Sequence, residues 1–219
     1  MLEATFGIKL FNCERQRLVI TDGWSIGLGR FAEAHPGIGL RVSATMHNID
    51  FVREEVDVAV RHGDGNWAGL TPSGFAPSSF FRSAVCSPEL MSGRNRKPSD
   101  LLKLPLLHLH DSKAWSQWLD AGGIADAETS HGLVVNRASM LIDAAVDGQG
   151  IALARTTLAA WDLINGRLAE PFDLSLKLSK TYWIVCPKAA SMKPKIVTFR
   201  DWLLAEAADD TRRLKKMFA

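Results

Sequence analysis

A strand that ends in a glycine-rich turn is the feature that most restricts what this chain can fold into. Between residues 56 and 61, β-branched valines alternate with Asp57, Ala59 and Arg61, and this two-residue period predicts a strand. The strand follows a short helical turn at residues 53–55 and ends in Gly-Asp-Gly at residues 63–65, where glycine tolerates the dihedrals of a sharp turn. In an open α/β sheet, ligands bind at the carboxyl ends of such strands. The stretch therefore predicts a sheet strand whose loop lies at a ligand-binding edge.

The pattern around this strand indicates a first βαβ unit. Residues 39–45 predict a strand and residues 46–53 a helix, and the short connections imply that the two flanking strands are parallel. Residues 66–79 are rich in proline and glycine and predict a loop. A strand at residues 80–86 is expected to lead from this first lobe into a second one.

A second βαβ unit is predicted between residues 131 and 154. It consists of a strand at residues 132–135, a helix at residues 137–147 and a strand at residues 151–154, with Asn136 as the expected helix cap. The apolar stripe expected on that helix consists of Met140, Leu141, Ala144 and Ala145. A strand at residues 178–186 then returns to the first lobe, and residues 194–207 predict a final helix.

The composition excludes several classes of protein. The chain has 219 residues, of which 47% are hydrophobic and 23% charged, and these values are typical of one large globular domain or two lobes. A formal net charge of +2 gives no support for a nucleic-acid-binding domain. The three cysteines lack metal-ligand spacing and are odd in number, which favours a reduced cytosolic setting. We find neither a signal peptide nor an apolar run of about 20 residues, and therefore expect a cytoplasmic protein.

Two segments resemble one family closely. Residues 52–65, Val-Arg-Glu-Glu-Val-Asp-Val-Ala-Val-Arg-His-Gly-Asp-Gly, and residues 144–155, Ala-Ala-Val-Asp-Gly-Gln-Gly-Ile-Ala-Leu-Ala-Arg, are similar to the effector-binding domain of LysR-type transcriptional regulators. The branch of the glycine-cleavage activator and the β-lactamase regulator is the nearest match. The resemblance implies an α/β fold, namely a two-lobed periplasmic-binding-protein-like (type 2) effector domain with two crossing strands. It also implies that the Trp-x-x-Trp-Leu segment at residues 115–119 packs one lobe.

The resemblance divides the chain into parts. It places lobe I at residues 24–82 and 187–207, lobe II at residues 83–186, and a basic tail at residues 208–219. Residues 1–11 resemble the end of the recognition helix of a winged helix-turn-helix with the turn after it, and residues 15–23 resemble the wing. The other DNA-reading helices, the dimerising linker helix and the first sheet strand of the family have no counterpart, so direct DNA binding by this chain alone is not expected.

The missing sheet strand leaves two interpretations open. A central strand cannot be absent without leaving buried backbone groups unpaired, so residues 17–21 are one candidate to take its place. The other interpretation treats residues 1–23 as a loose arm.

Other chemical sites have weaker support in the sequence. His108, His110 and Asp111 are residue types that bind zinc or iron, but no further ligand pair accompanies them, and no metal is predicted. Ser139 lacks the Gly-x-Ser-x-Gly elbow of a nucleophile, and Cys86 and Cys186 are expected to be packed rather than reactive. Residues 63–65 lack the following helix of a dinucleotide-binding loop, so no cofactor is predicted.

The preferred site is a ligand cleft between the lobes, formed by strand ends and helix N-termini. The candidate ligand-binding residues are Thr45, His47, Arg61, His62 and Trp67 in lobe I, and Asn136, Arg137 and Ser139 in lobe II. Thr21, with Asp22, stands in for the first-strand loop that the family uses. Two alternatives remain: Arg61 forms a salt bridge with Glu54 or Asp64, and Trp67 only caps the rim of the cleft.

The sequence thus predicts a shortened LysR-type regulator, not an enzyme, that senses a small anionic or amino-acid-like effector and changes conformation on binding it. By resemblance, the expected partner is a second copy or a full-length regulator, bound through residues 46–53 and 137–147. Two other functions stay open. One is a freestanding ligand-binding protein, and the other is a hydrolase-type enzyme that uses Ser139, His62 or Cys86.

Overall fold

The chain folds into two compact units. In the computed structural model the described residues are 5–12, 25–45, 48–74, 81–91, 98–110 and 113–217. Unit 1 comprises Met1–Ser78 and Ser179–Thr211, and unit 2 comprises Ser79–Leu178 and Arg212–Ala219. The chain therefore passes between the units three times. A strand follows each of the first two passages, β5 (Phe81–Val85) in unit 2 and β10 (Thr181–Pro187) in unit 1, and the third passage lies within the last helix.

Unit 1 is built on a five-stranded sheet with the order β2-β1-β3-β10-β4. Its other strands are β1 (Thr5–Asn12), β2 (Ile38–Thr45), β3 (Val58–Gly63) and β4 (Leu70–Gly74). The predicted valine-rich strand is confirmed as β3, and its first four residues are buried. The loop predicted over residues 66–79 is wrong in part, since β4 lies within it. Pro72 is tolerated there because β4 is an edge strand.

The position between β2 and β3 is filled by β1. Thr5 lies opposite both Thr45 of β2 and Arg61 of β3, and β1 runs antiparallel to both neighbours. Residues 5–12, which resemble the end of a recognition helix in sequence, are thus a strand. The first of the two open interpretations, a strand at residues 17–21 in this position, is wrong because β1 occupies it, and residues 17–21 lie outside the described residues. The second, a loose arm over residues 1–23, is wrong for residues 5–12, which pair with both neighbours.

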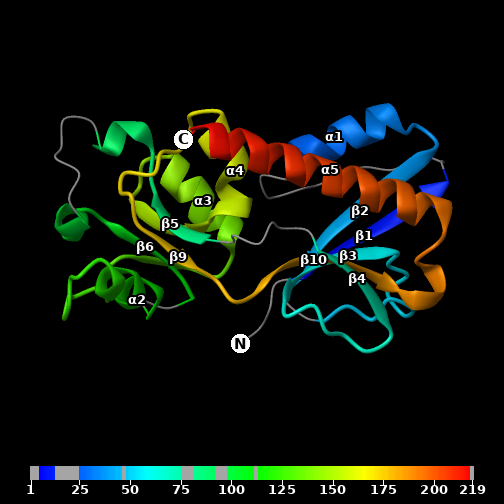
Figure 1. The fold of residues 1–219 in the computed structure, drawn as a ribbon, viewed down its shortest axis with the longest axis horizontal. Helices are drawn as coiled ribbons and strands as arrows, with labels where there is room; N and C mark the ends of the chain where they lie inside the picture. Colours follow the sequence, from blue (N-terminus) through cyan, green and yellow to red (C-terminus); the bar gives the residue numbers. More distant parts are fainter. Residues whose placement is uncertain are drawn as a thin grey trace. The chain divides into compact units, whose positions relative to one another are not determined.

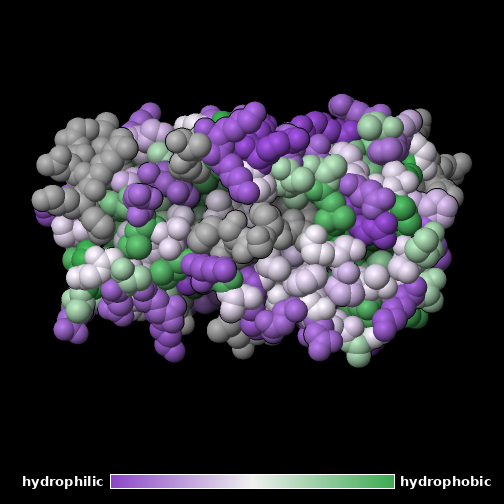
Figure 2. Space-filling view, viewed as in Figure 1, coloured by the Kyte–Doolittle hydropathy of each residue, from purple (hydrophilic) through white to green (hydrophobic). Residues whose placement is uncertain are grey.

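The helices of unit 1 pack against each other through aromatic rings. Phe31 of α1 (Ser25–Ala34) lies 5.1 Å from the rings of both Phe199 and Trp202 of α5 (Pro194–Met217). Figure 1 shows α1 and α5 on the same side of this sheet, and Figure 2 shows hydrophilic side chains gathered along the outer side of α5. The final helix is longer than predicted, because most of the basic tail continues α5.

A single capped turn replaces the helix predicted at residues 46–53. Residues 46 and 47 lie outside the described residues, and within residues 48–55 only one turn forms. The Asp50 carboxylate accepts hydrogen bonds from the amides of Val52 and Arg53, both at 3.1 Å, so the turn begins after residue 50. Glu55 ends it with a left-handed φ of 51°. The predicted charged turn at residues 53–55 is confirmed, but the longer helix is wrong.

Unit 2 contains a second five-stranded sheet with the order β7-β6-β8-β5-β9. Strands β6 (Leu106–Leu109), β7 (Leu133–Val135) and β8 (Ile151–Arg155) are parallel, whereas β5 runs antiparallel to both β8 and β9 (Ser175–Lys177). The described residues of unit 2 also form three α-helices and two short 3-10 helices, beside the end of the last helix: α2 (Lys113–Ala121), α3 (Ala138–Val146), α4 (Thr156–Ile164), η1 (Pro88–Met91) and η2 (Pro98–Lys103). A third 3-10 helix, η3 (Lys188–Ala190), follows β10 in unit 1.

Two tryptophans of α2 form the centre of the unit 2 core. Trp115 and Trp118 are both buried, with ring centroids 5.9 Å apart in an edge-to-face arrangement. Their indole N–H groups donate to the carbonyl oxygens of Leu107 at 2.9 Å and Leu174 at 3.1 Å. The packing role predicted for the Trp-x-x-Trp-Leu segment is confirmed.

Two details of the predicted α3 are wrong. Its N-cap residue is Arg137 instead of Asn136, and no side-chain hydrogen bond caps the helix. Met140 is 49% exposed, because Leu141, Ile142 and Ala145 form the buried face of the helix.

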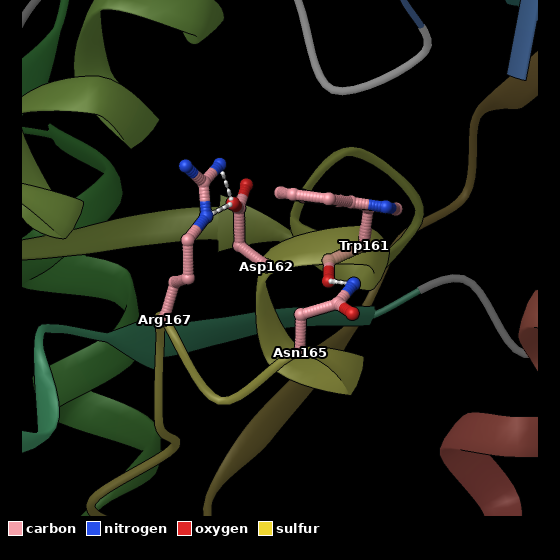
Figure 3. Close-up of polar contacts among 4 residues, drawn as sticks. All are labelled: Trp161, Asp162, Asn165 and Arg167. Atoms are coloured by element: carbon pink, nitrogen blue, oxygen red, sulfur yellow. Dashed lines mark hydrogen bonds and ion pairs between the residues drawn. The ribbon is translucent and has the colours of Figure 1, made fainter. Parts of the chain in front are cut away.

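A buried ion pair fixes the end of α4. The Asp162 carboxylate is buried and accepts hydrogen bonds from Nε of Arg167, at 2.7 Å, and from Nη2. Figure 3 shows this pair beside Trp161, whose ring lies 4.4 Å from the Arg167 guanidinium carbon. The amides of Arg167 and Leu168 also donate to the Asp162 carbonyl oxygen, so side chain and backbone hold the same turn.

Substitution Arg167→Met is expected to lower the free energy of unfolding by about 3 kcal/mol, because it leaves the Asp162 carboxylate buried without its ion-pair partner. This loss lies at the low end of the range for breaking a buried ion pair, since the arginine side chain is 49% exposed. Urea denaturation measures the loss. The double variant Asp162→Asn with Arg167→Met removes the buried charge and should lose less; an equal loss in both variants contradicts this account.

Candidate functional site

In unit 1, the carboxyl ends of β2 and β3 lie at one edge of the sheet. Thr45 ends β2 and Gly63 ends β3, and Thr5 lies beside them as the first residue of β1. Two further candidates from the sequence, Thr21 and His47, lie outside the described residues.

Arg61 and His62 lie on opposite faces of the sheet, because successive side chains of a strand alternate. Arg61 is only 6% exposed, and its Nη2 donates to the Ile49 carbonyl oxygen at 3.0 Å. Its guanidinium carbon lies 5.5 Å from the ring of Phe51 and 5.9 Å from that of Trp67. Arg61 and Trp67 therefore hold the capped turn against the sheet, whereas the His62 ring lies 5.2 Å from Tyr182 on the other face. One ligand is not expected to contact both Arg61 and His62.

The loop after β3 is held by Trp183 of β10. The indole N–H donates to the Gly63 carbonyl oxygen at 3.0 Å, and Lys180 forms an ion pair with Asp64 at 3.8 Å. Gly65 has a φ of 82°, and a Cβ atom there would lie 2.5 Å from the indole ring. Glycine is thus required at position 65 by both backbone conformation and packing.

In unit 2, the carboxyl ends of the three parallel strands gather polar and basic residues. His110 follows β6 with a left-handed φ of 68°, Asn136 and Arg137 follow β7, and Arg155 ends β8. Asn136 and Arg137 are exposed. Ser139, in the first turn of α3, is 7% exposed, and its hydroxyl makes no hydrogen bond within the described part of the chain. The sequence interpretation found Asn136, Arg137 and Ser139 but missed Arg155; its position at the end of a buried strand was the available signal.

The histidines of unit 2 do not converge on a metal. His108 is buried, with Nε2 3.0 Å from the His131 carbonyl oxygen, whereas His110 is exposed beyond the end of the strand. Asp111 lies outside the described residues, and these contain no group of three potential ligands. Cys86 and Cys186 are buried, and burial raises the pKa of the Cys186 thiol.

Three carboxyl groups of unit 2 have displaced pKa values. Burial raises the pKa of Glu170, against a hydrogen bond from Ser83 that lowers it. Burial, with repulsion from Asp162 and Asp147, likewise raises the pKa of Asp143. Hydrogen bonds from Ser130 lower the pKa of the exposed Glu128. Desolvation thus shifts the half-buried Glu170 and the largely exposed Asp143 toward the neutral form, whereas hydrogen bonding shifts Glu128 toward the charged form.

The comparison with known proteins identifies the family. Residues 28–208 match the model of the LysR substrate binding domain, so the chain belongs to this family. The chain is 33% identical over 190 residues to the glycine cleavage system transcriptional activator of Escherichia coli (strain K12). The aligned residues make up 86% of this chain and 62% of the relative. It is 32% identical over 184 residues to the HTH-type transcriptional activator AmpR of Rhodobacter capsulatus, covering 83% of the chain and 61% of the relative. The chain therefore spans less than two thirds of these curated relatives, which are regulators and not enzymes.

Solved structures show the same fold. The effector domain of AmpR from Pseudomonas aeruginosa has a TM-score of 0.65 at 27% identity, covering 86% of this chain and 93% of that chain. The AmpR effector binding domain from Citrobacter freundii has a TM-score of 0.66 at 25% identity, covering 89% of this chain and all of that one. The predicted two-lobed, periplasmic-binding-protein-like type 2 fold is confirmed. Within the described residues, no helix has the length and apolarity needed to span a membrane.

Substitution Glu170→Gln is expected to stabilise the protein at neutral pH but not at acidic pH. A carboxyl group whose folded pKa lies above its unfolded pKa costs stability as pH rises through these values, because ionisation is less favourable in the folded state. The gain over the parent protein should therefore grow between about pH 4 and pH 7. Urea denaturation across this range measures it.

Glu128→Gln is the control, and its effect on stability should have the opposite sign because the pKa of Glu128 is lowered in the folded state. This variant should lose stability relative to the parent as pH rises through the acidic range up to the ordinary glutamate pKa, and the difference should then stay constant up to neutral pH. If the stability gained by Glu170→Gln does not depend on pH, the raised pKa of Glu170 is contradicted.

Proposed function

We propose that this chain is the effector-binding part of a cytoplasmic LysR-type regulator, and that it binds a small anionic or amino-acid-like effector at the carboxyl edges of its sheets. Binding selects one conformation of the domain, and the whole regulator changes transcription in response. Membership of the LysR substrate binding family supports the function, and the open N-terminus of α3 supports the anionic effector. Backbone N–H groups at a helix N-terminus that no side chain caps favour a negatively charged ligand.

In unit 2, the proposed effector contacts are Asn136, Arg137 and Ser139. Arg137 supplies a positive charge at the start of α3, and the Ser139 hydroxyl supplies a hydrogen bond within the first turn. In unit 1, Thr21, Thr45, His47 and His62 stay proposed contacts, while Arg61 and Trp67 support the edge through the contacts described above.

Calorimetric titration with glycine, alanine, acetate and glycolate tests the effector proposal. We expect binding of at least one of these carboxylates, with a higher unfolding temperature in its presence. Arg137→Gln and Ser139→Ala should each weaken binding about tenfold, because each removes a hydrogen bond to a charged group. Met140→Ala is the matched control, since this exposed residue lies in the same turn of α3. Equal losses in the control, or no binding of any carboxylate, contradict the proposal.

We further propose that the domain forms a homodimer through the edge strand β7. Leu133 is 47% and Val134 55% exposed on this strand, and the exposed Met140 lies on α3, which packs against it. An open strand edge with exposed apolar side chains on both faces is suited to pairing with another strand, and two copies of β7 can pair antiparallel about a twofold axis. Residues 48–53 do not form the helix expected for the dimer surface, so the proposal retains only the region around α3. A full-length regulator would use the same edge.

Val134→Lys is expected to convert a dimer into a monomer, because a charge on a strand edge opposes pairing. Size-exclusion chromatography with light scattering measures the mass at micromolar concentrations. Val52→Lys is the control, since Val52 is exposed on the capped turn of unit 1. A monomeric parent protein, or a Val134→Lys variant that stays dimeric, rules out this surface.

A further inference from the structure

His110 lies where the connections of neighbouring strands in unit 2 diverge. The chain moves one way along the sheet from β6 to β7, and then back past β6 from β7 to β8. Because crossovers between parallel strands are right-handed, α2 and α3 lie on opposite faces of this sheet, as Figure 1 shows. In open α/β sheets, ligands bind at the carboxyl ends of strands at such a switch point. His110 is the residue that follows β6 there.

The backbone of His110 ends the regular alternation of β6. Its φ of 68° is left-handed, and among the described residues other than glycine only Glu55 and Asp126 share this conformation. The amide of His110 still donates to the Val135 carbonyl oxygen at 2.9 Å, so the residue stays attached to the neighbouring strand. Its side chain is exposed, and the imidazole forms no hydrogen bond or ion pair within the described part of the chain. The sheet thus fixes the position of a histidine whose ring is available to a ligand.

His110 lies beside the proposed effector contacts of unit 2. Leu109 pairs with Val135 in the parallel register, so the next residues along, His110 and Asn136, are neighbours about 4.8 Å apart. Ser139 belongs to the buried face of α3, which packs on β6 and β8. Its hydroxyl is buried without a partner among the described residues, and a ligand that bonds to it recovers the cost of that burial. Donors from β6, β7 and α3 therefore border one end of the sheet.

This spacing suits the substituent next to a carboxylate. In the proposed function, the effector carboxylate lies at the uncapped N-terminus of α3. A group on the carbon atom beside the carboxylate then lies within one strand spacing of it, about 5 Å, which is the separation of β7 from β6. Imidazole has one nitrogen that donates and one that accepts, so it can bond to a hydroxyl or an ammonium group at that position.

We propose that His110 contacts the effector and selects carboxylates with a hydrogen-bonding group on the carbon atom next to the carboxylate. The inference rests on the proposed function and narrows its effector class to 2-hydroxy and 2-amino acids. An unsubstituted acid of the same length forms no bond to the imidazole and binds more weakly.

Calorimetric titration of the whole chain with glycolate, glycine and acetate tests the inference at constant pH and ionic strength. The three probes share a carboxylate and one further carbon atom, and differ in the substituent on that atom. Glycolate or glycine is expected to bind about fivefold tighter than acetate, since it gains one hydrogen bond. Comparing the two shows whether the hydroxyl or the ammonium group fits better.

His110→Gly should bring the affinities for glycolate and glycine down to that of acetate in the same variant. Glycine adopts a left-handed φ without strain, so the variant is expected to fold, and urea denaturation checks this. Asp126→Gly is the matched control and should keep the preference. Asp126 has a similar φ of 56°, but it lies in the connection that enters the amino end of β7.

Three results overturn the inference while acetate binding leaves the proposed function standing. The first is equal affinity of the parent protein for all three probes, and the second is a preference that survives in His110→Gly. The third is a preference that Asp126→Gly also removes, since the backbone change alone would then explain the loss. If none of the three probes binds, the inference and the proposed function are both overturned.

Discussion

The structure of unit 1 depends on the pairing of buried backbone groups between β2 and β3. These two strands run in the same direction and are separated by the width of one strand, so a third segment must satisfy their hydrogen bonds. Thr5–Asn12 does so in the antiparallel direction. The amino end of β1 therefore lies beside the carboxyl ends of β2 and β3, and the first-strand loop expected from a parallel arrangement is not formed by β1.

The sheet of unit 2 differs from that of unit 1, because three of its neighbouring strands are parallel. Their carboxyl ends coincide at one edge, and α3, which follows β7, begins there without a side-chain cap on its first N–H groups. His110, Arg137 and Arg155 are distant in sequence but gather there. The basic character of this edge arises from the topology, since the chain as a whole carries a formal charge of only +2.

Two errors of the sequence interpretation have local causes, and a third has a tertiary cause. The helical pattern of residues 46–53 is interrupted by Asp50, whose side chain caps a turn in the middle of that stretch. Residues 66–79 contain enough proline and glycine to suggest a loop, but an edge strand tolerates Pro72. Met140 belongs to the apolar stripe by spacing alone, and which part of the stripe is buried depends on where α3 lies on its sheet.

The sequence by itself determined the family, the strand β3 and the tryptophan core. The alternation of apolar and polar residues, the turn residues and the sequences of the motifs are all local properties of the chain. It also identified Asn136, Arg137 and Ser139 as candidate ligand-binding residues. Only the tertiary structure decided that β1 fills the position beside β3, that Arg61 and His62 face opposite sides of a sheet, and that His110 lies beside Asn136. Strand order, direction and register depend on contacts between residues far apart in the sequence, and no local pattern encodes them.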